Sequence, residues 1–188
     1  MTLAAHPVRY GLAPAPWGPI HLAAADGAIV GVELFTPTDA FVASLERRLH
    51  RPVVAAGAGD TLLERAIAQV EAYLAGERQA FDLPIRLDGR SSWDRAILAA
   101  VTETRWGRVT SYGRLARHIG RPGAARAAGG AVGRNPIGLL VPCHRVIAGD
   151  GSLGGYGGAW YGTREQLLAI KRELLELEGI RLPAPFAD

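Results

Sequence analysis

The chain has 188 residues, of which 48% are hydrophobic and 21% are charged, and its formal net charge at pH 7 is +3. These proportions are typical of a globular protein that buries a core. A single cysteine excludes an internal disulfide and any zinc site built on two or more thiolates. No apolar run approaches the roughly 18 residues of a membrane span. Residues 1–7 lack the features of a secretory signal, so we expect a cytoplasmic protein with no membrane partner.

Charge is unevenly divided between the two halves of the chain. Residues 1–88 carry 7 basic and 10 acidic side chains, and residues 89–188 carry 14 and 8, so the halves have net charges of −3 and +6. The stretch from Thr104 to Gly149 contains eight arginines and no Asp or Glu. A preference for arginine would explain why Lys171 is the only lysine, but not why acidic residues are missing. The charge pattern therefore indicates a polyanionic partner, nucleic acid first.

The first half, residues 1–88, predicts a small antiparallel sheet with covering helices. Three runs have the pattern of strands: residues 8–12, 18–24 and 29–35. Asp26-Gly27, between the last two runs, is a strong hairpin signal. Helical periodicity predicts two helices, over residues 38–49 and 60–76, with a loop over residues 52–59 between them. No reactive cluster occurs in this half, so we expect a structural domain.

The second half, residues 89–188, predicts a mostly helical domain, which makes the whole chain α+β. Ser91, with Asp94 three residues later, forms a capping-box pattern that opens one helix. Two short helices, over residues 112–119 and 123–132, are separated by Gly120-Arg121-Pro122, a spacing typical of a helix-turn-helix. A last helix follows Thr163, which with Gln166 forms another capping box, and it ends at Gly179.

The helix predicted over residues 123–132 carries almost only alanine and glycine, and Arg126 is its one long side chain. Small residues let a backbone approach another surface closely, and an arginine there can reach a phosphate or a base. Close packing against another helix would explain the small residues equally well. The surrounding arginines and the absence of acidic residues favour nucleic acid.

Residues 140–147, Leu-Val-Pro-Cys-His-Arg-Val-Ile, contain the only cysteine, Cys143. A thiol must lose its proton to become a nucleophile, and a neighbouring imidazole or cation is the usual means. His144 supplies such an imidazole in the sequence. Most free cysteines, however, are small buried hydrophobic residues, and the local sequence leaves both interpretations open.

The chain nevertheless resembles the O6-alkylguanine-DNA alkyltransferases in a series of blocks that span most of residues 91–180. The blocks are VTSYG (109–113), AARA (124–127), GRNP (133–136), VPCHRVI (141–147), GYGG (155–158) and LLELEG (174–179). The resemblance implies a DNA-repair protein that takes the alkyl group from O6-alkylguanine, and possibly from O4-alkylthymine, in duplex DNA. Cys143 would accept the group irreversibly, in a single turnover.

The resemblance also implies roles for individual residues. His144 would deprotonate Cys143 through a water, Glu178 would orient His144, and Asn135 would hold the turn between the DNA-reading helix and an active-site strand. Tyr112 would help to rotate the nucleotide out of the duplex and protonate the leaving guanine, and Arg126 would replace the flipped base. The residues expected to contact DNA are Tyr112, Ala125, Arg126, Ala127, Gly129 and Arg134. Those expected to line the base pocket are Val146, Tyr156, Gly157 and Gly158.

The expected partner is double-stranded DNA that contains alkylated guanine, and the protein is expected to act as a monomer without a cofactor. Some family members hold a structural zinc through N-terminal cysteines and histidines, but this chain has no N-terminal cysteine, so no metal is expected. The chain departs from the family in about eight extra residues within 159–169, which border the expected pocket.

Three other classes compete with this interpretation. A Cys-His hydrolase would turn over repeatedly and would not need the arginine stretch, and its catalytic partners usually come from separate elements. Alkyltransferase-like proteins bind lesions without repairing them, but they lack the cysteine. A transcription regulator would use the helix-turn-helix and leave Cys143, His144 and Glu178 without a role.

Overall fold

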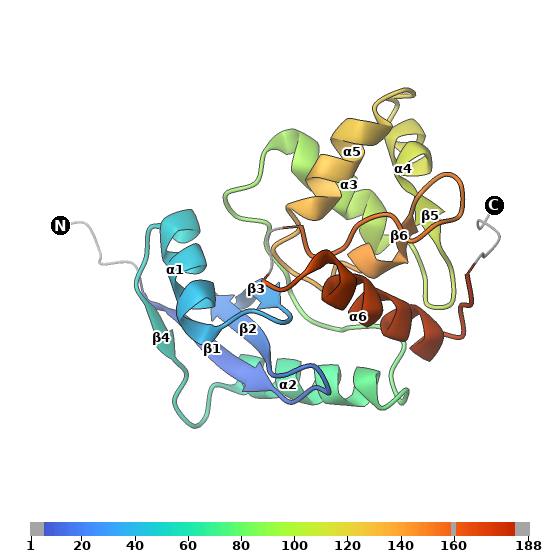
Figure 1. Cartoon of the computed structure of the whole chain (residues 1–188). Coiled ribbons are helices and arrows are strands. Elements are labelled where there is room, and N and C mark those ends of the chain that lie inside the picture. The colour runs from blue at the N-terminus through green and yellow to red at the C-terminus, as the bar shows by residue number, and fades with distance from the viewer. Residues whose placement is uncertain (1–5, 159–160, 183–188) are drawn as a thin grey trace. The chain divides into compact units, whose positions relative to one another are not determined.

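The computed structural model describes residues 6–158 and 161–182. The chain forms two compact units, one up to Gly89 and the other from Arg90 onward, which we call unit 1 and unit 2 (Figure 1). Unit 1 is a sheet with two long helices and unit 2 is mostly helical, so the α+β prediction is confirmed. Among the described residues, no helix is both long and apolar enough to cross a membrane.

Unit 1 is built on a four-stranded sheet in the order β3-β2-β1-β4. Along the chain its elements are β1 (Val8–Ala13), β2 (Ile20–Ala25), β3 (Ala28–Glu33), α1 (Thr38–Leu49), β4 (Val53–Ala55) and α2 (Thr61–Leu74). The hairpin between β2 and β3 turns at Asp26 and Gly27, whose φ angles of 48° and 78° suit a tight two-residue turn.

The prediction of an antiparallel sheet is wrong for one strand. The pairs β1–β2 and β2–β3 are antiparallel, but β4 pairs parallel with β1, in a segment that the sequence predicts as a loop. The cause is a crossover, because α1 carries the chain back to the start of β1. The backbone N–H of Val8 then donates to the carbonyl of Pro52 at 2.9 Å.

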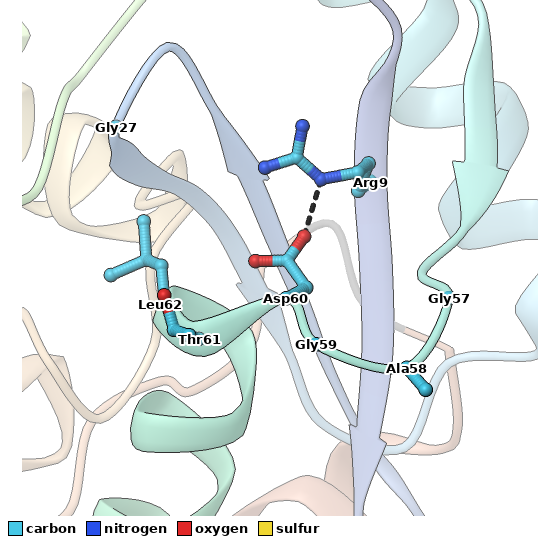
Figure 2. Close-up of a pocket in the computed structure, with 8 residues that line it drawn as sticks. All are labelled: Arg9, Gly27, Gly57, Ala58, Gly59, Asp60, Thr61 and Leu62. Carbon is cyan, nitrogen blue, oxygen red and sulfur yellow. Dashed lines mark hydrogen bonds and ion pairs between the residues drawn. The ribbon is translucent and has the colours of Figure 1, made fainter.

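The two helices of unit 1 cover opposite faces of its sheet (Figure 1). On one face, Phe41 and Leu45 of α1 are buried against apolar side chains of all four strands. On the other, Asp60 caps α2 and also pairs with Arg9 of β1, beside an open depression of about 380 Å³ (Figure 2). The hydrogen bond from Arg9 lowers the pKa of Asp60. Since the carboxylate both caps the helix and is paired, we assign it a structural role that ties α2 to β1.

Unit 2 contains a helix-turn-helix, as predicted. Its elements are α3 (Ser92–Thr102), β5 (Thr110–Ser111), α4 (Tyr112–His118), α5 (Ala125–Gly133), the 3₁₀ turn η1 (Cys143–Arg145), β6 (Val146–Ile147) and α6 (Arg164–Leu177). The helices α4 and α5 pack side by side (Figure 1). The predicted start of α5 is two residues early, because Gly123 has a φ of +92° that a right-handed helix does not accept.

Helix α3 holds α5 at both of its ends. Trp93 donates its indole N–H to the carbonyl of Ala127 at 3.3 Å, and the carboxylate of Asp94 binds Arg134, which caps the C-terminus of α5. The predicted capping box of α3 is only half formed: Ser91 accepts from the backbone of Asp94, while the Asp94 carboxylate turns to Arg134 instead. In α6, by contrast, both bonds of the capping box of Thr163 and Gln166 are present.

The cysteine lies on a turn, which corrects the expectation of an active-site strand. The chain leaves α5 through irregular backbone, and Leu139 has a φ of +63°, an uncommon conformation for a residue with a side chain. Cys143 then begins η1, and only Val146 and Ile147 form a strand, β6, which pairs parallel with β5. In a strand, hydrogen bonds to a neighbouring strand would direct the Cys143 side chain to one face of a sheet. The turn does not impose this constraint.

Candidate active site and nucleic-acid interface

Asn135 organises the backbone that leads to Cys143. Its side-chain carbonyl accepts from the N–H of Ile137 at 3.1 Å, and its amide donates to the carbonyl of Val141 at 2.8 Å. Asn135 is itself buried, so its amide satisfies backbone groups that would otherwise lose hydrogen bonds in the interior. The two bonds hold the irregular segment 137–141 in one conformation.

The Cys143 thiol is buried, with only 5% of the residue exposed. Burial raises the pKa of this thiol, since it disfavours the thiolate. A hydrogen bond from the Asn135 side chain and the positive charge of Lys171 act in the opposite direction. Cys143 is therefore a thiol at rest. Asn135 and Lys171 would stabilise the thiolate if a base accepted the proton.

His144, Glu178 and Arg145 form a buried charged network behind the cysteine. The Nε2 atom of His144 lies 2.8 Å from Oε1 of Glu178. Arg145 donates from Nε to both carboxylate oxygens, at 3.1 and 2.9 Å, and from Nη2 to Oε1 at 2.8 Å. Its Nη1 donates to the carbonyl of Thr104 at 2.6 Å, and the N–H of Gly107 adds a longer bond of 3.3 Å to Glu178.

The protonation states of this network follow from its burial and its bonds. Burial alone would raise the pKa of Glu178, but hydrogen bonds from His144 and Arg145, with their charges, outweigh it and lower that pKa to about 2. Burial lowers the pKa of His144 below its usual value despite the carboxylate. A neutral imidazole that donates Nε2–H to Glu178 has Nδ1 as its acceptor nitrogen. His144 is thus a buried, neutral imidazole that can accept a proton at Nδ1.

Lys171 is part of the same cluster, although the sequence does not predict it as a site residue. Its ammonium is fully buried and donates to the carbonyls of Val146, Leu153 and Gly155 at 2.5, 2.6 and 3.0 Å. Burial lowers the pKa of Lys171 to about 8, and the charge of Cys143 opposes that shift. Two signals point to it: it is the only lysine in the chain, and it lies on the buried face of α6 seven residues before Glu178.

Tyr112 is the helix-turn-helix residue that interacts electrostatically with Cys143. It is the first residue of α4, and its ring is within contact distance of positions that side chains on Gly129 and Gly154 would occupy. Burial raises the pKa of Tyr112, a backbone hydrogen bond involving Gly155 opposes this, and the charge of Cys143 reinforces it. The phenol therefore stays protonated at neutral pH.

The glycine-rich loop 149–158 is held against the rest of unit 2 from two sides. Lys171 binds two of its carbonyls, and Gly158 touches the last residue of α5 so closely that a Cβ there would meet the carbonyl oxygen of Gly133 at 2.8 Å. Of the expected pocket residues, Val146 lies in β6, and its carbonyl accepts from Lys171. Tyr156, Gly157 and Gly158 lie at the end of the loop. Residues 159–160 of the extra segment lie outside the described residues, and residues 164–169 form the first part of α6.

The residues expected to contact DNA lie on or beside α5. Arg126 and Ala127 are exposed, and Ala125 and Gly129 are half-buried. Arg126 has no ion-pair partner among residues 6–158 and 161–182. The Arg134 side chain is 50% exposed but is bound by the Asp94 carboxylate, at 3.0 Å from Nε and 2.6 Å from Nη2. Arg134 therefore also ties α5 to α3.

The fold and the site together define a class: a thiol-based group-transfer protein that carries its cysteine next to a helix-turn-helix. Comparison with known proteins agrees. The family model described as 6-O-methylguanine DNA methyltransferase, DNA binding domain, matches residues 92–180. The ribonuclease-like domain of the same methyltransferase matches residues 8–87.

Individual relatives match over nearly the whole chain. The methylated-DNA–protein-cysteine methyltransferase of Mycobacterium bovis is 37% identical over 177 residues, 94% of this chain and 96% of the relative. That of Methanosarcina acetivorans is 40% identical over 64% of this chain and 71% of its own length. A crystal structure of Mycobacterium tuberculosis OGT in complex with DNA has a TM-score of 0.73 and 35% identity, and covers 91% of this chain and 92% of that one. The chain belongs to the 6-O-methylguanine DNA methyltransferase family.

Proposed function

We propose that this protein repairs DNA directly, by moving the alkyl group of O6-alkylguanine to Cys143 in a single, irreversible turnover. The observation that carries the proposal is the arrangement at Cys143: a buried thiol supported by Asn135 and Lys171, with a His144–Glu178 pair behind it. The mycobacterial relative, whose structure was solved in complex with DNA, supports DNA as the partner.

The first step is activation of the thiol. The proton of Cys143 passes through a water to the acceptor nitrogen Nδ1 of His144, and the resulting imidazolium is stabilised by the Glu178 carboxylate, which follows the logic of nucleophile, base and orienting acid. Arg145 keeps Glu178 ionised at every physiological pH, because it binds both carboxylate oxygens. Lys171 and Asn135 stabilise the thiolate while it exists.

The second step is displacement at the alkyl carbon. A sulfur–carbon bond forms as the carbon–O6 bond breaks, and the electron pair of the broken bond stays on guanine. Tyr112 donates its proton to the leaving purine, because a protonated purine is a better leaving group. The thioether on Cys143 has no proton to lose and no group that departs readily, so the cysteine is used once. A thiolate and an acid complete this chemistry without a cofactor.

The alkylated base must leave the duplex to reach the sulfur. Flipping a base costs a few kcal/mol of stacking and pairing, and we propose that Arg126, which is exposed on α5, occupies the vacated position. The small residues around it, Ala125, Ala127 and Gly129, let the helix approach a narrow minor groove. We expect the protein to act as a monomer, since every group of the proposed site belongs to one chain, and we expect it to work in the cytoplasm.

Replacing Arg126 with alanine separates flipping from chemistry. We expect the transfer rate from a methylguanine duplex to fall about 10- to 100-fold, as for a loss of 1.4–2.7 kcal/mol, because the vacated position in the stack is no longer filled. Reaction with free benzylguanine, which needs no flipping, should change less than about threefold. Rates are measured by single-turnover kinetics, with Arg172→Ala as a control for charge. Equal losses on both substrates would contradict the role of Arg126.

Replacing Gly158 with alanine tests the close contact between the glycine-rich loop 149–158 and Gly133 of α5. The new Cβ would overlap the backbone of Gly133, so the loop must move away from α5, and we expect a cost of about 1–3 kcal/mol. The ratio of benzylguanine to methylguanine reactivity should change with the shape of the pocket. Gly155→Ala, in the same loop, is the matched control because nothing lies within 4 Å of its Cβ position. Equal thermal stabilities of the two variants would show that the contact between Gly158 and Gly133 is unimportant.

The stoichiometry of repair tests the proposal against a hydrolase. A methylguanine duplex in excess over the protein should yield restored guanine up to one equivalent per protein and then no more. A hydrolase that uses the same cysteine would continue beyond one equivalent. A protein that only recognises the lesion would restore none.

A further inference from the structure

Two cationic side chains of α6 bind the glycine-rich loop. The Lys171 ammonium donates to the carbonyls of Leu153 and Gly155, at 2.6 and 3.0 Å. The carbonyl between these two, that of Gly154, accepts from Nη2 of Arg164 at 3.4 Å. Arg164 and Lys171 are seven residues apart, which is about two turns, so they lie on the same face of the helix. Helix α6 therefore binds three consecutive carbonyls of the loop.

The part of the loop that α6 binds lies next to Tyr112. Gly154 has a φ of +70°, and a Cβ on it would lie 3.2 Å from the Tyr112 hydroxyl oxygen. The backbone of Gly155 makes a hydrogen bond with the same phenol. A shift of the peptide between these two glycines would therefore change the position of the hydroxyl or its hydrogen bond.

Arg164 belongs to the extra segment within residues 159–169 that departs from the family pattern. It is the first residue of α6, directly after the N-cap Thr163, and the capping box of Thr163 and Gln166 fixes this first turn. The Arg164 side chain is exposed, so its charge would be hydrated without the bond to Gly154. The bond is therefore not needed to compensate a buried charge, and its effect falls on the loop.

We propose that Arg164 is a positioning residue, which binds the Gly154 carbonyl and so holds the glycine-rich loop against Tyr112. The proposal rests on the proposed function, in which Tyr112 donates a proton to the leaving guanine. An acid in this role must be within hydrogen-bond reach of the atom that it protonates. Lys171 binds the loop from the interior and Arg164 binds it from the solvent side. The extra segment thus helps to orient the acid.

A double-mutant cycle between Arg164→Gln and Tyr112→Phe tests this role. Arg164→Gln alone should slow methyl transfer from a methylguanine duplex about three- to tenfold, as for the loss of one hydrogen bond. The loss should be the same with free benzylguanine, because proton donation to guanine is common to both substrates. In the Tyr112→Phe background, which lacks the acid, Arg164→Gln should slow transfer less than about twofold. Single-turnover kinetics measures all four rates.

Two further variants separate positioning from other effects of the substitution. Arg164→Lys keeps a charged donor and should retain most of the wild-type rate. Arg172→Gln removes an exposed arginine from the same helix and should leave the rates unchanged in both backgrounds. Thermal unfolding shows whether each variant is folded.

Equal losses from Arg164→Gln with and without the Tyr112 hydroxyl would overturn the proposal, because Arg164 would then act independently of the acid. A loss confined to the duplex substrate would overturn it too, since it would make Arg164 a DNA contact. Failure of the wild type to transfer methyl to Cys143 would instead overturn the proposed function, whatever the cycle shows.

Discussion

Cys143→Ala should abolish alkyl transfer and leave the binding of alkylated DNA nearly intact. The chain has no second thiol, and the imidazole beside Cys143 is engaged by Glu178, so no other group can take over as acceptor. We expect transfer to fall by more than about 10⁴-fold and affinity for a methylguanine duplex to change less than about threefold. Single-turnover repair assays and equilibrium binding measure the two effects.

Cys143→Ser is the control for size. The serine hydroxyl fills the same space, but it is a far weaker nucleophile and is as deeply buried, so this variant should be as inactive as the alanine variant. Removing one buried sulfur costs about 1 kcal/mol, as for other small deletions in a core. A large loss of DNA binding in both variants would mean that the cysteine is structural and would contradict the assignment of Cys143 as acceptor.

Glu178→Gln should be the most damaging substitution outside the cysteine. The amide keeps the shape of the carboxylate but removes its charge, which leaves the nearly buried guanidinium of Arg145 without a counter-ion. Breaking a buried pair in this way costs about 3–5 kcal/mol. The base His144 would also lose its stabilisation as an imidazolium, and we expect transfer to slow by about 10²-fold or more. Thermal unfolding and single-turnover rates measure the two losses.

The same substitution should remove a defined acid sensitivity. The folded-state pKa of Glu178 is lowered from 4.5 to about 2, so the unfolded chain binds the proton more readily between these values. The stabilisation is therefore complete above about pH 4.5 and is lost as the pH falls toward 2. The stability difference between the wild type and Glu178→Gln should be constant above about pH 5 and should shrink below it.

Glu176→Gln supplies the matched control, because Glu176 lies on the same helix and is exposed. It should leave stability and transfer rate close to those of the wild type. A stability difference between the wild type and Glu178→Gln that stays constant down to pH 3 would show that Glu178 is not held ionised by its partners. A normal transfer rate in Glu178→Gln would remove it from the proton relay.

Local signals in the sequence predict most of the framework. The Asp26-Gly27 turn and the apolar stripes of α1, α2 and α6 depend on residues close together in the chain, and each is present in the structure. The strand β4 is not predictable in this way. Three residues carry no periodicity, and what makes them a strand is the parallel neighbour β1, more than forty residues away.

The surroundings of the cysteine show the same limit. Residues 137–141, Ile-Gly-Leu-Leu-Val, have the composition of a buried strand, but the hydrogen bonds of Asn135 to Ile137 and Val141 hold this segment in an irregular conformation. Lys171 acquires its role only because the loop 149–158 folds back and offers it carbonyl groups. When the partners of a side chain are backbone atoms far away in the chain, the sequence gives little indication of its role. For Lys171 the one local indication is a charged residue on the buried face of a helix.

The central claim is that Cys143 accepts the alkyl group, and peptide mapping by mass spectrometry tests it most directly. The protein is mixed with an excess of a duplex that contains methylguanine, its intact mass is measured, and the peptide that contains Cys143 is sequenced. We predict a mass increase of one methyl group per protein, located on Cys143. An unmodified protein alongside restored guanine, or a methyl group on any other residue, would contradict the claim.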